Sequence, residues 1–299
     1  MTLSGLPGLV ISHLGKGLAV EDGQGVIRLC HTRRRLGDVA VGDRVLWEEC
    51  EDGQGRVLSV EPRRSRLIRP AYGGRIRLVA ANLDLVCLVI ASEPPPDWLL
   101  VDQVLAVCES QGIAAALVVN KADIAGGSQA LEATLQDYCV AGYECFMVSA
   151  HEGTGLAALN GHLSGREALF CGQSGVGKSS LTNALLPDKQ LRVGELSRKS
   201  GLGKHTTTAA TLFHLPQGGH LIDSPGVAIF GLAGMTASAL AYAYREFLPL
   251  LGHCRFNDCR HQGDLGCAIG AAVETGELSS ARYGRFCRLL GQLGQPDFI

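Results

Sequence analysis

Hydrophobic and polar positions divide this chain of 299 residues into three blocks. Residues 1–75 carry short β-rich runs separated by turn signals such as Glu21-Asp22-Gly23. The pattern predicts four or five strands, at 8–11, 17–20, 26–30, 39–47 and 55–60. Strands of this number and spacing are typical of a small all-β barrel, for which the five-stranded OB fold is a common solution.

The middle block, residues 76–235, alternates strands with helices. A continuous apolar run at 85–91 predicts a parallel strand that is buried on both faces. Helical periodicity follows at 98–110, and further strands are expected at 115–119, 144–148 and 167–171. This alternation is typical of a doubly wound α/β sheet, which binds its ligands at the carboxyl ends of the strands. The last block, residues 236–299, contains an amphipathic helix at 279–293.

The composition indicates a folded protein of a reducing compartment. Hydrophobic residues make up 46% of the chain and charged residues 19%, and no apolar run reaches the ~18 residues of a membrane span. The first residues do not form a secretory signal. Eleven cysteines without such a signal indicate core residues or metal ligands rather than disulfides, so we expect a cytoplasmic protein. Separately, we expect a monomer with no membrane partner.

Charge is unevenly distributed although the net charge is only −2. Residues 1–75 hold 12 basic against 9 acidic residues, whereas residues 76–235 hold 9 against 14. A run of arginines without an intervening acid contains Arg63, Arg64, Arg66, Arg69, Arg75 and Arg77. It is equally consistent with a nucleic-acid surface and with a solvated linker. A second basic group, Arg33-Arg34-Arg35, falls in a barrel loop, where we favour RNA binding over a merely solvated loop.

The segment Gly172-Gln173-Ser174-Gly175-Val176-Gly177-Lys178-Ser179 matches the P-loop pattern G-x-x-x-x-G-K-[ST]. Its glycines let successive backbone N–H groups point at an anion, and Lys178 adds a charge for the β- and γ-phosphates. The Ser179 hydroxyl can bind Mg²⁺. Ser180 opens a helix predicted at 180–186, whose positive end would face the phosphates.

Three shorter boxes make the middle block resemble GTPases. Asn120-Lys121-Ala122-Asp123 matches the N-K-x-D guanine box, in which Asp123 would accept two donors of guanine while Asn120 and Lys121 support the pocket. Ser149-Ala150 matches the S-A box, whose backbone contacts the base. Asp223-Ser224-Pro225-Gly226 matches D-x-x-G, where Asp223 holds Mg²⁺ through water and the Gly226 N–H senses the γ-phosphate.

The order of these boxes is permuted. GTPases ordinarily run from P-loop to D-x-x-G, N-K-x-D and S-A, whereas here N-K-x-D and S-A come before the P-loop. A circular permutation explains this, with 155–165 as the join, because domain termini often lie close together. The D-x-x-G box then leads directly into the last block, so a movement driven by the γ-phosphate would be passed on to it.

Four potential metal ligands lie within fourteen residues of the last block: Cys254, Cys259, His261 and Cys267. Three thiolates and an imidazole suit one tetrahedral structural zinc per chain, and the polar loop around them disfavours separate core cysteines beside a surface histidine. Cys287 is expected to be a packing residue. The predicted helix also carries three arginines at helical spacing: Arg282, Arg285 and Arg288. They form either a solvated helix face or a face that contacts RNA.

Together these motifs resemble the RsgA (YjeQ) family of bacterial circularly permuted GTPases over essentially the whole chain. The resemblance implies an OB-fold barrel at 1–75, a permuted α/β P-loop GTPase domain at 76–235 and a helical zinc-binding domain at 236–299. It also implies hydrolysis of GTP to GDP and phosphate in late maturation of the small ribosomal subunit. The partners would be that subunit, which stimulates hydrolysis, and its rRNA.

The sequence identifies the catalytic residues less closely than the binding residues. Lys178 and Mg²⁺ would neutralise the γ-phosphoryl, and one threonine among Thr206, Thr207 and Thr208 would join Ser179 on Mg²⁺. Val227 follows D-x-x-G where many GTPases place a water-orienting glutamine, so the intrinsic rate should be slow. His205 is the nearest replacement, or else a mobile residue without a catalytic part. A P-loop ATPase or kinase, and an RNA-binding protein that only senses nucleotide, remain alternatives.

Overall fold

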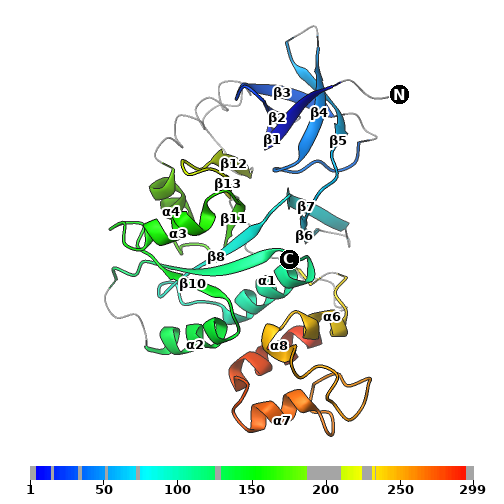
Figure 1. Cartoon of the computed structure of the whole chain (residues 1–299), viewed down its shortest axis with the longest axis vertical. Coiled ribbons are helices and arrows are strands. Elements are labelled where there is room, and N and C mark those ends of the chain that lie inside the picture. The colour runs from blue at the N-terminus through cyan, green and yellow to red at the C-terminus, as the bar shows by residue number, and fades with distance from the viewer. Residues whose placement is uncertain are drawn as a thin grey trace.

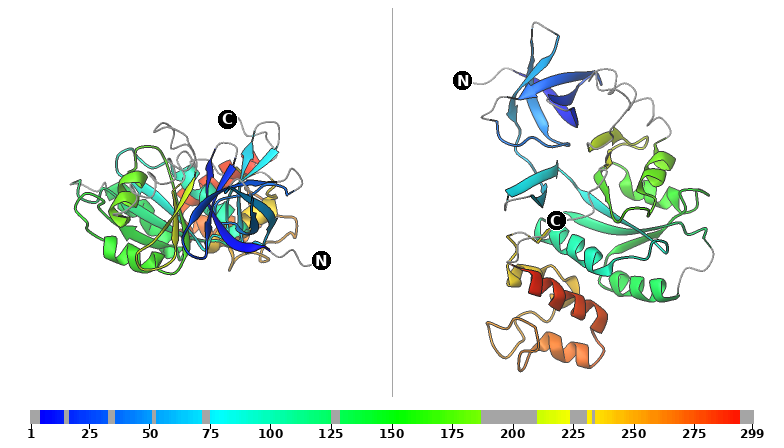
Figure 2. Two further views of the ribbon diagram at one scale, coloured as in Figure 1. Left: turned by 90° about the horizontal axis from the view of Figure 1, so that it is seen from above. Right: turned by 180° about the vertical axis from the view of Figure 1, so that it is seen from behind.

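The computed structural model describes residues 5–14, 17–32, 36–50, 53–71, 75–124, 129–186, 210–223, 231–232 and 234–293. Three parts follow one another along the long axis of the molecule: a small barrel, a central sheet with helices, and a group of helices (Figure 1). The view from behind shows the same succession (Figure 2). The helices of the described ranges all fall short of the length or the hydropathy that a bilayer-spanning helix needs.

The barrel consists of β1 (Leu6–Leu14), β2 (Gly17–Asp22), β3 (Ile27–Thr32), β4 (Arg44–Glu49) and β5 (Gly55–Val60). The strands run in the order β1-β2-β3-β5-β4, and β4 pairs back onto β1. The β3–β5 pair is parallel and the other pairs are antiparallel. This closure confirms the predicted OB-fold barrel, whose interior is filled by side chains such as Val10, Val45, Trp47 and Val57.

One predicted strand was too long. The apolar run at 39–47 becomes a strand only from Arg44, because the buried Asp43 turns the chain before it. The Asp43 carboxylate accepts hydrogen bonds from the Ala40 N–H at 2.8 Å and from Arg63 at 2.6 and 2.7 Å. A carboxylate without solvent needs such partners, and they are supplied by the turn at Ala40 and by Arg63, which follows β5.

The arginine run after the barrel is neither a linker nor wholly a free surface. It forms a hairpin that the sequence analysis missed, with β6 (Arg66–Ala71) antiparallel to β7 (Arg75–Ala81). Arg63 is bound to Asp43, and Arg64 pairs with Asp84 at 2.7 Å. Arg63 is thus held against a buried carboxylate, whereas Arg64 is largely exposed and its ion pair lies at the surface.

The central sheet contains β8 (Leu85–Ala91), β9 (Ala114–Asn120), β10 (Glu144–Met147), β11 (Glu167–Cys171), β12 (Thr211–His214) and β13 (His220–Asp223). The order is β10-β9-β8-β11-β13-β12, with the first five strands parallel and β12 antiparallel to β13. The helices are α1 (Trp98–Ser110), α2 (Gln129–Val140), α3 (Leu156–Leu163) and α4 (Lys178–Leu185). This is the predicted α/β architecture.

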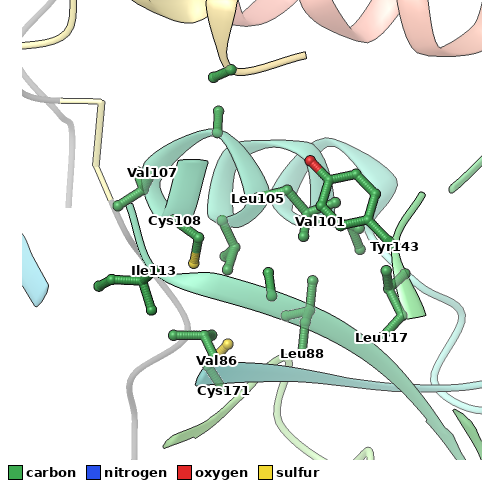
Figure 3. Packing of buried hydrophobic residues seen from close by; sticks show 14 of the residues in the cluster. Val86, Leu88, Val101, Leu105, Val107, Cys108, Ile113, Leu117, Tyr143 and Cys171 are labelled. Atoms are coloured by element: carbon green, nitrogen blue, oxygen red, sulfur yellow. The ribbon is translucent and has the colours of Figure 1, made fainter. Parts of the chain in front are cut away.

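Strand β8 is buried on both faces, as its continuous apolar run predicts. Val86, Leu88 and Ile90 belong to the cluster that includes α1, whereas Leu85, Cys87 and Val89 belong to the cluster that includes α3 and α4. Figure 3 shows Val101, Leu105 and Cys108 of α1 packed over Val86 and Leu88. The alternation follows from the two-residue period of a strand, and it fixes the sheet between two helical layers.

The predicted join at 155–165 contains a helix of its own, α3, whose Leu159 and Leu163 are buried. The sheet also continues into the barrel, because Ser12 of β1 pairs with Thr211 of β12. The Ser12 hydroxyl donates to the Ala210 carbonyl at 3.0 Å. The barrel thus rests on the strand pair that ends at the D-x-x-G box.

The last part contains α6 (Ala237–Tyr242), a 3-10 helix (Arg245–Phe247), α7 (Ala268–Glu274) and α8 (Ser280–Gln292). Tyr244, Phe247 and Phe286 pack ring against ring at its centre. Helix α8 lies against α1 of the central part.

The helical spacing of the α8 arginines predicts either a solvated or an RNA-facing line, but two of the three arginines are bound to carboxylates. Arg282 is 3% exposed and its guanidinium bonds to Asp102 of α1 at 3.0 Å and to Glu246. Arg285 binds the other oxygen of the Asp102 carboxylate. Arg288 is exposed. The helical spacing therefore marks one solvated arginine and two that dock α8 onto the sheet domain.

Candidate functional site

The P-loop runs from the end of β11 into the first turn of α4, and two of its glycines are required by contacts. Gly172 has φ 134°, and a Cβ there would lie 2.1 Å from the carbonyl oxygen of Val89. Gly177 has φ 91°, and a Cβ there would lie 2.3 Å from Nδ2 of Asn120. The glycine pattern therefore lets the loop pass close to β8 and to the N-K-x-D box.

The Lys178 side chain folds back onto the backbone of the P-loop. Its Nζ donates to the carbonyl oxygens of Gly172 and Gln173 at 2.7 and 2.6 Å. Burial lowers the pKa of Lys178, and the negative charge of Asp223 opposes that shift. Val176 is buried, whereas the rim of the loop and the start of α4 are exposed at Ser174, Gly175, Ser179 and Ser180. A cation is thus placed beneath a solvent-facing rim, as phosphate binding requires.

Asn120 joins three of the predicted boxes. Its side chain is 2% exposed, and its Nδ2 donates to the Val176 carbonyl of the P-loop at 3.0 Å. Its Oδ1 accepts the N–H of Ala150 in the S-A box at 3.1 Å. One amide therefore holds the P-loop and the S-A box at a set distance from the N-K-x-D box. The expected supporting role is consistent with this contact, whose partners sequence alone did not reveal.

Asp123 is the acceptor proposed for the guanine base. A hydrogen bond from Ser149 is the main reason that the pKa of Asp123 is lowered, with contributions from its own backbone and from His151. Its carboxylate is therefore ionised and oriented by the S-A box. The neighbouring Ala122 N–H donates to the Val148 carbonyl at 3.0 Å, which fixes the N-K-x-D turn on the segment after β10 that carries Ser149.

A loop that the sequence analysis did not select completes the surroundings. It connects β8 to α1, and its Glu93 carbonyl accepts from Lys121 Nζ at 2.6 Å. The Asp97 N–H donates to Oε1 of Gln173 at 2.9 Å. The Asp97 carboxylate accepts hydrogen bonds at the N-terminus of α1 and so caps this helix. An Asp just before a helical pattern is a visible capping signal, but nothing local announces the contact with the P-loop.

Asp223 ends β13, and the register places it opposite Phe170, just before the P-loop. This position agrees with a role beside the phosphates. The remaining expected residues of this region lie outside the described residues: His205, Thr206, Thr207, Thr208, Gly226 and Val227. Arg33, Arg34 and Arg35 of the barrel loop also lie outside them.

A second candidate site brings the four predicted metal ligands together. The ligand atoms of Cys254, Cys259, His261 and Cys267 all lie within 4.8 Å of one another. Nδ1 of His261 is 3.5 Å from Sγ of Cys254 and 3.6 Å from Sγ of Cys267. Spacings of this size suit a tetrahedral site with metal–ligand bonds of about 2.0–2.3 Å.

The sulfurs of this site also receive backbone hydrogen bonds. The Ala268 N–H donates to Sγ of Cys254 at 3.4 Å, and the Gly270 N–H donates to Sγ of Cys267 at 3.3 Å. Both donors belong to the first turn of α7, for which Cys267 is the N-cap. Donors aimed at sulfur support the thiolate form that binds a metal, so the chemistry of the residues fits a metal ion.

Comparison with known proteins matches this architecture. The family model described as RsgA GTPase matches residues 60–233. The chain is 43% identical over 293 residues to the small ribosomal subunit biogenesis GTPase RsgA of Pseudomonas aeruginosa PAO1, covering 97% of this chain and 86% of that protein. The protein of the same name from Haemophilus influenzae Rd is 42% identical over 294 residues, covering 96% and 85%.

Solved structures agree in fold as well as in sequence. YjeQ from Thermotoga maritima superposes with a TM-score of 0.76 at 29% identity, covering 97% of this chain and 99% of that chain. YloQ, described as a circularly permuted GTPase, superposes with a TM-score of 0.73 at 26% identity, covering 99% and 98%. The similarity includes the barrel, the permuted sheet and the C-terminal helices, because it extends over nearly the whole chain.

Proposed function

The chain belongs to the RsgA GTPase family, and on that premise we propose that it binds and hydrolyses GTP in the late maturation of the small ribosomal subunit. Its relatives are named for that biogenesis role. The observation that carries the proposal within this chain is the Asn120 contact. That side chain holds the P-loop and both base-recognition boxes together.

Guanine specificity would come from the N-K-x-D and S-A boxes. An ionised Asp123 can accept hydrogen bonds from N1–H and from the exocyclic amine of guanine, whereas adenine offers no such pair of donors. The hydrogen bond from Ser149 orients that carboxylate, and backbone groups of Ser149 and Ala150 would contact the base. Lys121 would line the pocket from its position against Glu93. These contacts favour a GTPase over an ATPase.

The phosphates and Mg²⁺ would be held by the P-loop and by the residues that flank it. Backbone N–H groups of Gly172 to Ser180 would surround the phosphates, and Lys178 would supply the positive charge. Mg²⁺ would be bound by Ser179, by one threonine among Thr206, Thr207 and Thr208, and by Asp223 through water, while the Gly226 N–H would meet the γ-phosphate. When bound, Mg²⁺ neutralises charge that develops on the transferred phosphoryl group.

Hydrolysis would be slow in the free protein and fast on the ribosomal subunit. Val227 has no group that can orient water, so another group must do so, and we propose His205. Docking on the subunit would place His205 near the attacking water. The stimulation then arises in the transition state rather than from tighter GTP binding.

The flanking parts would serve docking and stability. We propose that residues 1–75 contact rRNA, residues 76–235 form the GTPase unit, and residues 236–299 bind one structural zinc through Cys254, Cys259, His261 and Cys267. The boundary at 75 falls at the first residue of β7, so the hairpin connects the first two units. We further propose that the protein acts in the cytoplasm as a monomer.

The experiment is a multiple-turnover GTPase assay with and without purified small subunits. We expect slow release of phosphate from the free protein and a large stimulation by subunits, with ATP unable to compete. Lys178→Ala is the inactive control, because it removes the charge beneath the phosphates. Binding of GTP without turnover at saturating subunits would instead identify a nucleotide sensor, and competition by ATP would refute the guanine assignment.

A further inference from the structure

Cys139 and Cys145 form a pair of neighbouring thiols outside both candidate sites. Their sulfurs lie 2.8 Å apart, and Sγ of Cys145 also donates to the Tyr143 carbonyl at 3.5 Å. Both side chains are half-buried. The pair is therefore in contact with solvent while being held in mutual contact by the fold.

A short hydrogen-bonded turn sets the geometry of the pair. Cys139 lies one residue before the end of α2, and Cys145 is the second residue of β10. The Gly142 N–H donates to the Cys139 carbonyl, and the Tyr143 N–H donates to the Tyr138 carbonyl, both at 3.0 Å. A disulfide bond of about 2.05 Å requires the sulfurs to approach by roughly 0.8 Å, which small side-chain rotations provide.

The S-A box follows two residues after the strand that carries Cys145. Among the described strands, β10 pairs with β9 alone and forms the edge of the sheet. Directly after it, the Val148 N–H donates to the Val119 carbonyl at 2.8 Å, and Ala150 bonds to Asn120. Because a four-residue edge strand frays easily, opening of β10 would release Ser149 and Ala150 from the base pocket.

We propose that Cys139 and Cys145 are a redox-sensitive dithiol, which hydroperoxides oxidise to a disulfide that fastens β10 to α2 and slows the release of guanine nucleotide. The nucleotide part of this inference rests on the proposed function, whereas formation of the disulfide does not. The bond would act on the S-A box through the strand, without touching the nucleotide.

The reaction balances with hydrogen peroxide as oxidant. Burial and the contact with Cys139 raise the pKa of the Cys145 thiol, so we assign the first attack to Cys139. Its thiolate forms an S–O bond, the O–O bond breaks, and the leaving hydroxide takes a proton to become water. Sγ of Cys145 then displaces the sulfenic oxygen as a second water. The two thiols lose two electrons, which the peroxide gains.

The expected effect follows from the size of the closed loop. A disulfide across about seven residues makes opening of that loop on the order of 50-fold rarer in the chain-entropy estimate. If release of nucleotide requires β10 to open, dissociation of GDP should slow by up to the same factor. Reduction of the disulfide should restore the original rate.

The test treats the full-length protein with hydrogen peroxide and follows two readouts. A protease that cleaves after glutamate separates peptides 133–144 and 145–152, so these remain joined only through the disulfide. Dissociation of a fluorescent GDP analogue gives the nucleotide readout. Cys139→Ser and Cys145→Ser are the test variants, and Cys50→Ser, at a half-buried thiol of the barrel, is the matched control.

We expect joined peptides and slower dissociation in the wild type and in Cys50→Ser, and neither in the two test variants. Absence of joined peptides while other thiols are oxidised would overturn the proposal. Joined peptides with an unchanged dissociation rate would overturn the link to the S-A box. If neither form of the protein binds GDP, the proposed function fails along with that link, and the peptide map still decides the fate of the thiols.

Discussion

Replacement of Asp102 by alanine should detach α8 from the central sheet domain. Asp102 is 1% exposed, and both oxygens of its carboxylate are bonded. Oδ1 accepts from the Tyr138 hydroxyl at 2.8 Å and from Arg282 at 3.0 Å, while Oδ2 accepts from Arg285. The single carboxylate of Asp102 therefore balances the positive charges of two guanidinium groups that α8 brings into the interior.

The magnitude follows from what the substitution leaves behind. Arg282 would keep Glu246, whose Oε2 lies 3.2 Å from Nη2 of the guanidinium. Arg285 would keep the Tyr138 hydroxyl at 3.4 Å, which does not balance its charge. Removing one partner of a buried ion pair typically costs 3–5 kcal/mol, so we expect about 3 kcal/mol, because Arg282 stays paired.

Tryptophan fluorescence offers a local probe for this prediction. Trp98 begins α1, and its ring stacks on Tyr138 with the centroids 5.4 Å apart. Trp47 is the other tryptophan of the chain and lies in the barrel core, so every protein compared would carry Trp47→Phe. Urea titrations of Trp98 emission then give the change in free energy of unfolding at this interface.

Arg288→Ala is the matched control, because Arg288 belongs to the same helix but is exposed. It should change the free energy of unfolding by less than about 0.5 kcal/mol. A cost below about 1 kcal/mol for Asp102→Ala would refute the reasoning, as would an Arg288→Ala variant that is destabilised as much as Asp102→Ala.

Three further predictions concern the two candidate sites and the catalytic step. Asp123→Asn should weaken binding of GTP and favour xanthosine triphosphate, because the amide donates where xanthine presents an acceptor; unchanged GTP affinity in a competition titration would exclude the base pocket. Cys259→Ser should lose the one zinc per chain measured by elemental analysis and expose residues beyond about 250 to proteolysis, since the energy of a structural zinc is folding energy; a zinc-free protein that resists proteolysis would contradict this. His205→Ala should keep its GTP affinity and lose most of the stimulation by small subunits, and turnover at the wild-type rate would remove His205 from catalysis.

Local patterns in the sequence determined several elements of this protein. The helix at Trp98–Ser110 and the strands at Leu85–Ala91 and Glu167–Cys171 have the predicted bounds. Each is specified by a period of 3.6 or by a continuous apolar run with a turn or cap beside it, and these signals lie within the element itself. The spacing of Cys254, Cys259, His261 and Cys267 likewise suffices to predict one cluster, because a short loop can bring all four together.

The tertiary structure alone decided what the polar residues do. Arg63, Arg282 and Arg288 look alike in sequence, yet the first two are bound to carboxylates and the third faces solvent. The partner of Arg282 lies 180 residues away, and that of Asn120 in the P-loop lies 56 residues away. A charge or an amide gains or loses free energy according to whether its partner replaces the water that burial removes, and that partner is chosen by packing rather than by neighbouring residues.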